Sequence, residues 1–210
     1  MIFKKIIYKI RGLLKVCIDS PQYKDFNDWQ SVCSVLGESS FWKNKNTKAL
    51  DLGCGDRIQN PFKAEKAYGV DLRNDLSNSL IKVANLSTQP IPFANEQFAF
   101  ISAFDFIEHV PRILTGSSGS SLDTFFPFIN LMNEVHRCLQ PNGYFLSRTP
   151  GYPFSISFTD PTHVNHIDEY TFVNYFSGML LGKTYGFKGE FEVVRQGWEG
   201  RYLITLLKKV

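Results

Sequence analysis

The sequence predicts an α/β fold in which a doubly wound, mainly parallel sheet ends in an antiparallel hairpin. Four apolar runs of strand length support this prediction, because each is apolar enough to be buried on both faces of a sheet. These runs are Lys48–Leu52, Lys66–Leu72, Phe98–Phe104 and Gly143–Thr149. Strands that alternate with helices pack as a parallel sheet covered by those helices, so the order of the runs indicates the fold class.

Helices and turns are predicted around the later runs. Segment 122–143 has one apolar helical face and ends in a proline and a glycine, which are typical stop signals. That face consists of Phe125, Phe128, Ile129, Met132, Val135 and Leu139. A second helix is expected around residues 169–181, and the polar segment 115–121 is expected to be an exposed loop. Segment 189–210 holds two apolar runs joined by residues 196–200, which predicts the terminal hairpin.

Composition and charge limit the classes of function. The chain has 210 residues, of which 43% are hydrophobic and 20% are charged, as in one globular domain. A net charge of only +3 offers no broad basic surface, so we expect no binding of nucleic acid through phosphates. Four scattered cysteines form neither a disulfide framework nor a zinc knuckle, which favours a reducing cytoplasm.

The first 40 residues are predicted to be a helical extension of two helices, ahead of a main domain over residues 41–210. Residues 1–15 alternate apolar and basic residues at helical spacing. One interpretation is a helix that lies on an anionic membrane at its inner face, or on a partner. The other is a helix packed on its own domain. No run of 18 apolar residues exists, so we expect no membrane-spanning helix.

The stretch "DLGCGD" follows the first predicted strand and contains Gly53 and Gly55. Glycines at the carboxyl end of a parallel strand let the backbone approach a ligand closely. Asp71 ends the next strand, where a carboxylate can accept both hydroxyls of a ribose. Ile58 stands where a dinucleotide-binding fingerprint requires a third glycine. The pattern therefore favours a nucleoside cofactor that lacks phosphates.

With these residues in view, the sequence resembles the class I S-adenosylmethionine-dependent methyltransferases of the small single-domain type. "ALDLGCGD" (49–56) resembles their first motif and "YGVDL" (68–72) resembles the segment with the ribose-binding acid. Residues 84–110 resemble the adenine-contact stretch with the fourth strand, and residues 132–150 resemble the following helix, turn and fifth strand. The resemblance covers about residues 47–150. It implies S-adenosylmethionine as cofactor and a seven-stranded Rossmann-like sheet.

The resemblance also implies cofactor-binding residues. Asp51, Gly53 and Gly55 would surround the amino-acid part of the cofactor, and Asp71 would bind the ribose. Asn85 and Leu86 would lie by the adenine, and Ala103 and Phe104 near the methionine part. The full predicted set is Asp51, Gly53, Cys54, Gly55, Asp71, Leu72, Asn85, Leu86, Ala103 and Phe104. The interval from Gly55 to Tyr68 is too short for a full first helix.

The stretch "FTDPTHVNHIDEY" (158–170) is the strongest candidate for handling a substrate. Asp160, His163 and His166 could provide a general base or orient a hydroxyl. They could instead bind zinc or iron, although supporting ligands are not evident, and we predict no metal. A structural loop, with Asp168 capping the next helix, is the third interpretation.

"DFIEHV" (105–110) offers Glu108 and His109 just after the predicted fourth strand, beside the expected cofactor pocket. In the methyltransferases that the chain resembles, this pair often lies beside the methyl group. Glu108 and His109 are therefore further catalytic candidates, and helix capping is the alternative.

The predicted function is a cytoplasmic methyltransferase that acts on an oxygen, in preference to a nitrogen, of a small molecule or glycan precursor. "DPTHVN" (160–165) resembles a segment of bacterial methyltransferases of saccharide biosynthesis, which suggests a saccharide substrate. One alternative is a non-catalytic S-adenosylmethionine-binding partner or scaffold protein, and another is an NAD-dependent oxidoreductase. The oligomeric state is left open.

Overall fold

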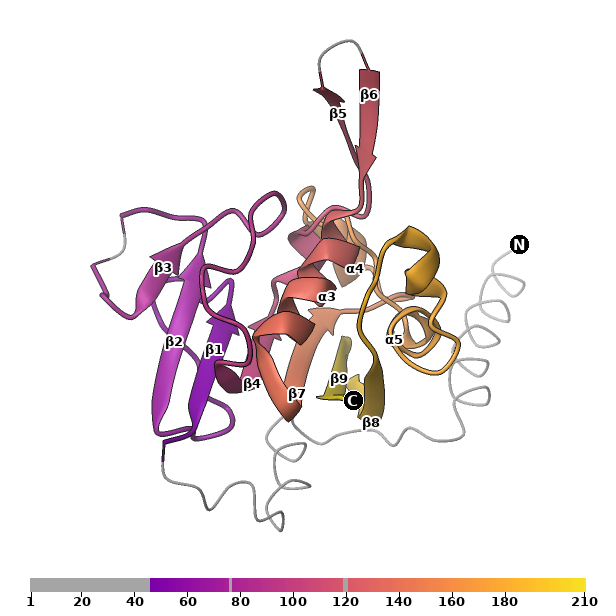
Figure 1. The fold of residues 1–210 in the computed structure, drawn as a ribbon. Helices are drawn as coiled ribbons and strands as arrows, with labels where there is room; N and C mark the ends of the chain where they lie inside the picture. Colours follow the sequence, from indigo (N-terminus) through magenta and orange to yellow (C-terminus); the bar gives the residue numbers. More distant parts are fainter. Residues whose placement is uncertain (1–45, 76, 119–120) are drawn as a thin grey trace.

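The computed structural model describes residues 46–75, 77–118 and 121–210. Its main sheet has seven strands in the order β3-β2-β1-β4-β7-β9-β8 (Figure 1). These strands are β1 (Lys48–Leu52), β2 (Lys66–Asp71), β3 (Ile81–Val83), β4 (Phe98–Phe104), β7 (Leu139–Pro150), β8 (Phe191–Glu199) and β9 (Tyr202–Lys209). Only β9 runs against its neighbours, since it pairs antiparallel with both β7 and β8. The predicted fold class is confirmed.

Strand β1 lies at the centre of the parallel part of the sheet. Leu52 is in register with Val70 of β2 and Ala103 of β4, so these three strands end at one edge. All seven residues of β4 are buried, as expected of a strand covered on both faces. The turns that follow β1, β2 and β4 are therefore brought together.

Helix α3 (Pro127–Cys138) begins with a proline at its first turn and packs its apolar side into the core. It is shorter than segment 122–143, for which a helix was predicted. Phe125 lies in strand β6 and is exposed, and Leu139 already belongs to β7. The buried apolar positions Phe128, Met132 and Val135 were predicted correctly.

Four short helices complete the described residues: η2 (Ile107–His109), α4 (Ile156–Thr159), α5 (Glu169–Tyr175) and η3 (Leu181–Tyr185). Asp168 caps α5, because its carboxylate accepts the backbone N–H of Tyr170. Helix α5 ends before the predicted residue 181, since Gly178 and Leu180 adopt positive φ angles that helices do not allow.

The polar segment 115–121 is not a simple loop. Strands β5 (Leu114–Ser118) and β6 (Ser121–Phe125) pair as an antiparallel hairpin that projects from the body of the protein (Figure 1). A hairpin away from the core needs no continuous apolar face, so its polar sequence gave no strand signal.

The terminal hairpin is confirmed, but its turn is not the predicted segment 196–200. Gln196 and Gly197 are buried inside β8, and the chain reverses at Gly200, which has a φ of +59°. Strand β9 then enters the sheet between β7 and β8.

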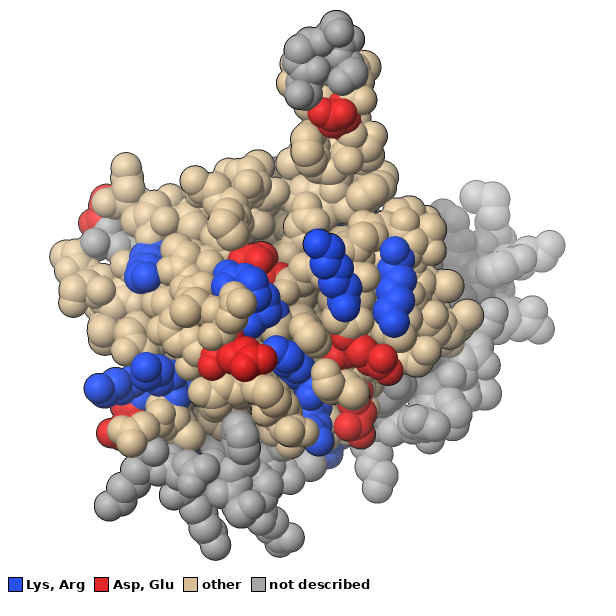
Figure 2. All heavy atoms as spheres, viewed as in Figure 1, with Lys and Arg blue, Asp and Glu red and all other residues tan. Residues whose placement is uncertain are grey.

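The predicted two-helix extension (1–40) and its contact with a membrane lie outside the described residues. Among the residues described, no helix is both long and apolar enough to cross a membrane. As expected, the interval after Gly55 contains turns rather than a full helix. On the face shown in Figure 2, basic and acidic side chains of the described residues are interspersed. This mixture agrees with the low net charge, and the absence of nucleic-acid binding stays a prediction.

Candidate active site

The turn after β1 is shaped by its glycines. The N–H groups of Gly53 and Cys54 both donate to the carbonyl of Val70, at 2.8 and 3.2 Å. Gly53 has a φ of +68°, and a Cβ there would lie 2.4 Å from the ring of Phe106. Any other residue would therefore be strained and would clash with that ring. Phe106 thus joins the turn after β1 to the segment after β4.

Asp71 closes the same turn from the end of β2. Its Oδ2 accepts the N–H of Gly55 at 2.8 Å, and its Oδ1 accepts the N–H and Nε of Arg73, each at 3.0 Å. Burial acts to raise the pKa of Asp71, but the bonds from Arg73 and Gly55 outweigh it and hold that pKa below its usual value. Asp71 is therefore a carboxylate with one oxygen on the glycine turn and the other on Arg73.

Asp51 connects this turn to the neighbouring strand. It is 1% exposed, and it accepts hydrogen bonds from Ser102 Oγ and the backbone N–H of Gln59, both at 2.8 Å. Burial raises its pKa to about 7, even though both bonds act to lower it. Cys54 is a packing residue: its Sγ lies where a Cβ on Gly69 would clash, and burial raises its pKa to about 12.

Three candidate catalytic side chains meet beyond the end of β4. Glu108 and His109 lie in η2, and His163 comes from the loop before α5; one ligating atom of each lies within 4.8 Å of the others. Asn165 holds the loop in place, because its Nδ2 donates to the carbonyl of Ile107 at 3.0 Å. The Glu108 carbonyl also accepts the N–H groups of Val164 and Asn165. The three side chains, called here the EHH cluster, are therefore fixed relative to one another.

Thr162 and Asp160 determine which ring nitrogen of His109 carries the proton. The Thr162 hydroxyl lies 2.9 Å from His109 Nδ1 and donates to Asp160 Oδ1 at 2.6 Å. A hydroxyl has one proton to donate, so Thr162 accepts from His109 Nδ1–H. We assign the Nδ1–H tautomer on this ground, which leaves Nε2 with a free lone pair. Bonds from the Thr162 hydroxyl and N–H hold the pKa of Asp160 below its usual value.

Glu108 is 1% exposed. Its Oε2 accepts the hydroxyl of Thr149 at 2.8 Å, whereas Oε1 is buried with no hydrogen-bond partner among the described residues. Burial raises its pKa to about 7. A buried acceptor without a partner is costly, and such groups often mark a site that binds something.

Comparison with known proteins identifies the family. A family model described as "Methyltransferase domain" matches residues 24–184. The chain belongs to this methyltransferase family. A search of curated proteins gives no significant match.

Solved structures share the methyltransferase fold at low sequence identity. A chain of the complex that contains the Haloferax volcanii Trm112 methyltransferase activator has a TM-score of 0.55 and 12% identity, over 86% of this chain and 89% of that one. An S-adenosylmethionine-dependent methyltransferase from Aquifex aeolicus gives 0.51 and 16%, over 88% and 95%. Another from Mesorhizobium loti gives 0.51 and 13%, over 83% and 100%. The family and these names imply S-adenosylmethionine as the cofactor of this methyltransferase.

The edge of the sheet fits that cofactor. The backbone of the glycine turn adopts positive φ angles at Gly53 and Gly55, and Asp71 Oδ2 accepts the N–H of Gly55. Leu72 follows Asp71 and is exposed. The guanidinium of Arg73 lies over Gly55, but its side chain is 53% exposed, so the group is free to rotate away.

Of the remaining predicted cofactor residues of the methyltransferase, two lie at a turn and two lie in the core. The Asn85 side chain accepts the N–H of Ser87 and starts a turn, beside the buried Leu86. Ala103 and Phe104 are buried in the core at the end of β4, so only their backbone lies at the edge.

Not all predicted catalytic residues of the methyltransferase meet. The ring of His166 stacks on Phe158 with centroids 4.2 Å apart, away from His163, so the predicted grouping of Asp160, His163 and His166 is replaced by the EHH cluster. Asp168 is a helix cap. The sequence analysis missed Thr149 and Thr162, because a lone threonine gives no signal until its partner is known.

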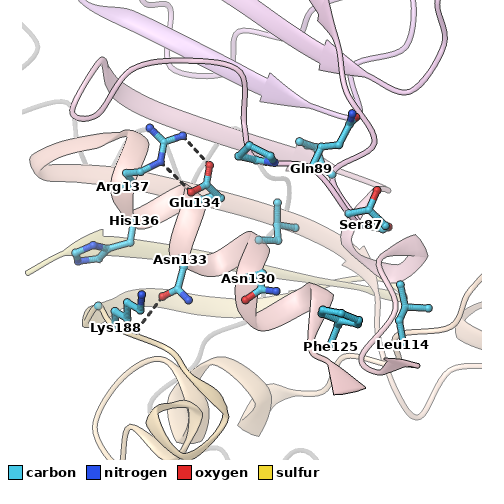
Figure 3. Close-up of a pocket in the computed structure, with 15 residues that line it drawn as sticks. Ser87, Gln89, Leu114, Phe125, Asn130, Asn133, Glu134, His136, Arg137 and Lys188 are labelled. Carbon is cyan, nitrogen blue, oxygen red and sulfur yellow. Dashed lines mark hydrogen bonds and ion pairs between the residues drawn. The ribbon is translucent and has the colours of Figure 1, made fainter. Parts of the chain in front are cut away.

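Two hollows lie on the described surface of the methyltransferase domain. A groove of about 810 Å³ runs along α3, with Ser87, Leu114 and Phe125 at one end and His136 and Lys188 at the other (Figure 3). A pocket of about 480 Å³ is rich in aromatic side chains. Its lining includes Phe126, Tyr152, His166, Tyr170, Tyr175 and Tyr185. This aromatic pocket lies next to the loop of His163, because Arg112 in its wall donates to Asn165 Oδ1 at 2.7 Å.

Proposed function

We propose that this methyltransferase moves a methyl group from S-adenosylmethionine to an oxygen of a small molecule or glycan precursor. One observation carries the choice of oxygen: His109 is held as the Nδ1–H tautomer, with its Nε2 lone pair in the EHH cluster. A hydroxyl must lose its proton to become a good nucleophile, whereas a neutral amine already has a lone pair. A built proton acceptor therefore favours oxygen over nitrogen.

On this proposal the cofactor lies along the edge formed by β1 and β2. The backbone of Gly53 and Gly55 and the buried Asp51 would surround its amino-acid part, and Asp71 would accept the ribose hydroxyls. Leu72, Asn85 and Leu86 would lie by the adenine. Support comes from the positive φ of both glycines and the orientation of Asp71 by Gly55.

When bound, S-adenosylmethionine supplies a methyl group on a sulfonium, which leaves as a neutral thioether. The protein then has to align the acceptor, exclude water and take the proton. His109 would take it at Nε2, while Thr162 and Asp160 stabilise the imidazolium through Nδ1. Glu108 and His163 would lie beside His109 in the EHH cluster, and Phe106, which packs on Gly53, would close one side.

The aromatic pocket is the proposed acceptor site. Tyrosine rings beside His166 and Asp168 combine apolar faces with hydrogen-bonding groups, which suits the ring of a saccharide or a similar small molecule. His166 would orient the acceptor rather than accept its proton, because its ring lies outside the EHH cluster.

Neither alternative from the sequence is favoured by the family match. A non-catalytic partner would not need a histidine held in one tautomer, and an NAD-dependent enzyme would need the phosphate-binding glycine that Ile58 replaces. The cytoplasmic location stays a proposal that rests on cysteine usage. Cys54 and Cys138 are both free and buried, which is compatible with a reducing compartment.

The test is methyl transfer from labelled cofactor into a panel of small molecules and saccharide precursors. Asp71→Ala should lose binding of S-adenosylhomocysteine by calorimetry and lose transfer with it. His109→Ala should keep that binding and lose turnover by about 100-fold or more, the usual range for a general base. Magnetic resonance of the product should place the methyl on oxygen. A methyl on nitrogen or carbon, or full turnover by His109→Ala, would overturn the proposal.

A further inference from the structure

In the EHH cluster one possible ligand atom of each side chain lies within 4.8 Å of the others. Glu108 Oε1 and His163 Nδ1 are both buried and lack a hydrogen-bond partner within the part of the chain that the structure describes. The lone pair that His109 can offer is on Nε2, because its Nδ1 carries the proton donated to Thr162. Two buried atoms without partners therefore belong to the same cluster, and such atoms call for an explanation such as a bound ion.

The tautomer of His163 follows from the same carboxylate. Its Nε2 lies 4.0 Å from Asp160 Oδ2, so the ring proton is favoured on Nε2 and Nδ1 keeps its lone pair. Asp160 therefore faces the outer nitrogen of both histidines, directly at His163 and through Thr162 at His109. Carboxylates that orient the outer nitrogen of an imidazole are the common outer shell of metal-binding histidines.

A shared proton does not explain the arrangement. No hydrogen bond joins any two of Glu108 Oε1, His109 and His163 Nδ1 among the described contacts, and the atoms spread over as much as 4.8 Å. Atoms bound to one ion at about 2.0–2.2 Å lie about 3–3.6 Å apart, so the cluster would have to close by about 1 Å to hold an ion.

We propose that Glu108, His109 and His163 bind one divalent first-row transition metal ion. Two imidazoles and one carboxylate suit Zn²⁺, Fe²⁺, Mn²⁺ or Co²⁺ and leave coordination positions open. From the sequence we predicted no metal, because no supporting ligands were evident beside Asp160, His163 and His166.

The site is rigid in the way that a metal site requires. Thr149 fixes the second oxygen of Glu108, and Asn165 fixes the His163 loop to η2. Phe106, two residues before Glu108, contacts Gly53, so the proposed ion would lie at the same edge as the cofactor turn. This last step rests on the proposed function: with the ion bound, His109 Nε2 is a ligand and no longer the base, and the ion would instead lower the pKa of an acceptor hydroxyl that reaches it, so that the hydroxyl loses its proton to solvent.

The test uses full-length, untagged protein stripped with a chelator and titrated with Co²⁺ and Zn²⁺. We expect one ion per chain and an absorption band of bound Co²⁺ that disappears when Zn²⁺ replaces it. His163→Ala should weaken binding by more than the 10–100-fold usual for an outer-shell change. Glu108→Gln should do the same, and it is the safer variant for folding because Gln still accepts the Thr149 hydroxyl.

The matched control is His166→Ala, which removes the neighbouring imidazole of the same loop and should leave Co²⁺ affinity within about twofold of the wild type. Circular dichroism checks that each variant is folded. Absence of stoichiometric binding, or wild-type binding by folded Glu108→Gln, would overturn the metal site. Binding of S-adenosylhomocysteine by the wild type is measured in parallel. If the wild type does not bind it, the cofactor assignment is wrong, whereas the metal result still stands.

Discussion

At the proposed cofactor side of the site the backbone supplies the geometry, whereas at the proposed acceptor side three side chains supply it. The turn at Gly53 and Gly55 is closed by bonds to Val70 and Asp71. The EHH cluster instead keeps buried lone pairs without partners in the described structure. The turn of residues 51–55 together with Asp71 is called here the cradle. The contrast teaches that a complete set of hydrogen bonds marks a preformed binding surface such as the cradle, whereas an incomplete set marks a place that a ligand completes.

The largest expected effect is on stability and concerns Asp51, the buried acid of the cradle. It tests whether this carboxyl group is protonated in the folded protein. The folded pKa of Asp51 is about 7 against an ordinary 3.8, so the folded state retains a proton that the unfolded state loses. Its stabilisation is complete below about pH 4 and is lost as pH rises through 7. A shift of about three units corresponds to about 4 kcal/mol as an upper bound.

We therefore expect urea unfolding to show falling stability between about pH 4 and pH 7, and Asp51→Asn to reduce that fall. Glu108 shifts in the same direction, so the difference between wild type and variant isolates Asp51. Parallel curves for the two proteins would mean that the cradle does not bury this proton.

The second effect tests whether backbone geometry alone builds the cradle. Gly53→Ala should weaken S-adenosylhomocysteine binding by about 100-fold, because the strain of about 1–3 kcal/mol at positive φ adds to the clash with Phe106. Gly200→Ala is the control: it has a similar φ, and nothing lies within 4 Å of its Cβ. If folded Gly53→Ala binds within threefold of wild type, the cradle assignment fails.

The third effect addresses the acceptor side. Thr162→Val keeps the shape of the side chain and removes the acceptor for His109 Nδ1–H. We expect kcat to fall about 10-fold, the value of one hydrogen bond near 1.4 kcal/mol, and its pH profile to shift. Binding of S-adenosylhomocysteine should not change, and Thr162→Ser should restore the rate. An unchanged pH profile would reduce Thr162 to a loop-packing role.

The smallest effect returns to the cofactor side. Arg73 pairs with Asp71 across the exposed edge, where solvent screens the pair and makes it weak. Arg73→Gln should therefore tighten cofactor binding by up to about fivefold, since the ribose acid no longer has to exchange a partner. Weaker binding in calorimetry would show that Arg73 itself contacts the cofactor.

Local patterns predicted the positions of the glycine turn and of Asp71 well. The glycine turn and Asp71 are each signalled within a few residues of a buried strand, and strand ends meet at one edge of a parallel sheet. Strand β3 escaped notice because it has three residues, two of them exposed. The β5–β6 hairpin escaped because its sequence is polar.

The acceptor side could be predicted only in part. Glu108, His109 and His163 were candidates, but their convergence depends on Asn165 binding the backbone of Ile107, a contact between segments 58 residues apart. His166 was grouped with His163 because it is near in sequence, whereas stacking on Phe158 turns its ring elsewhere. Which nitrogens are free depends on Thr162 and Asp160, and spacing along the chain does not encode a tautomer.

The position of β9 has a consequence for how the chain assembles. Strand β8 pairs only with β9 in the described sheet, so β8 cannot join the sheet before β9 is in place. Until then β7 presents the unpaired edge of residues 144–150. Such an edge is open to pairing with another chain. Docking of this hairpin, a contact distant in sequence, is therefore the step at which we expect folding to compete with aggregation.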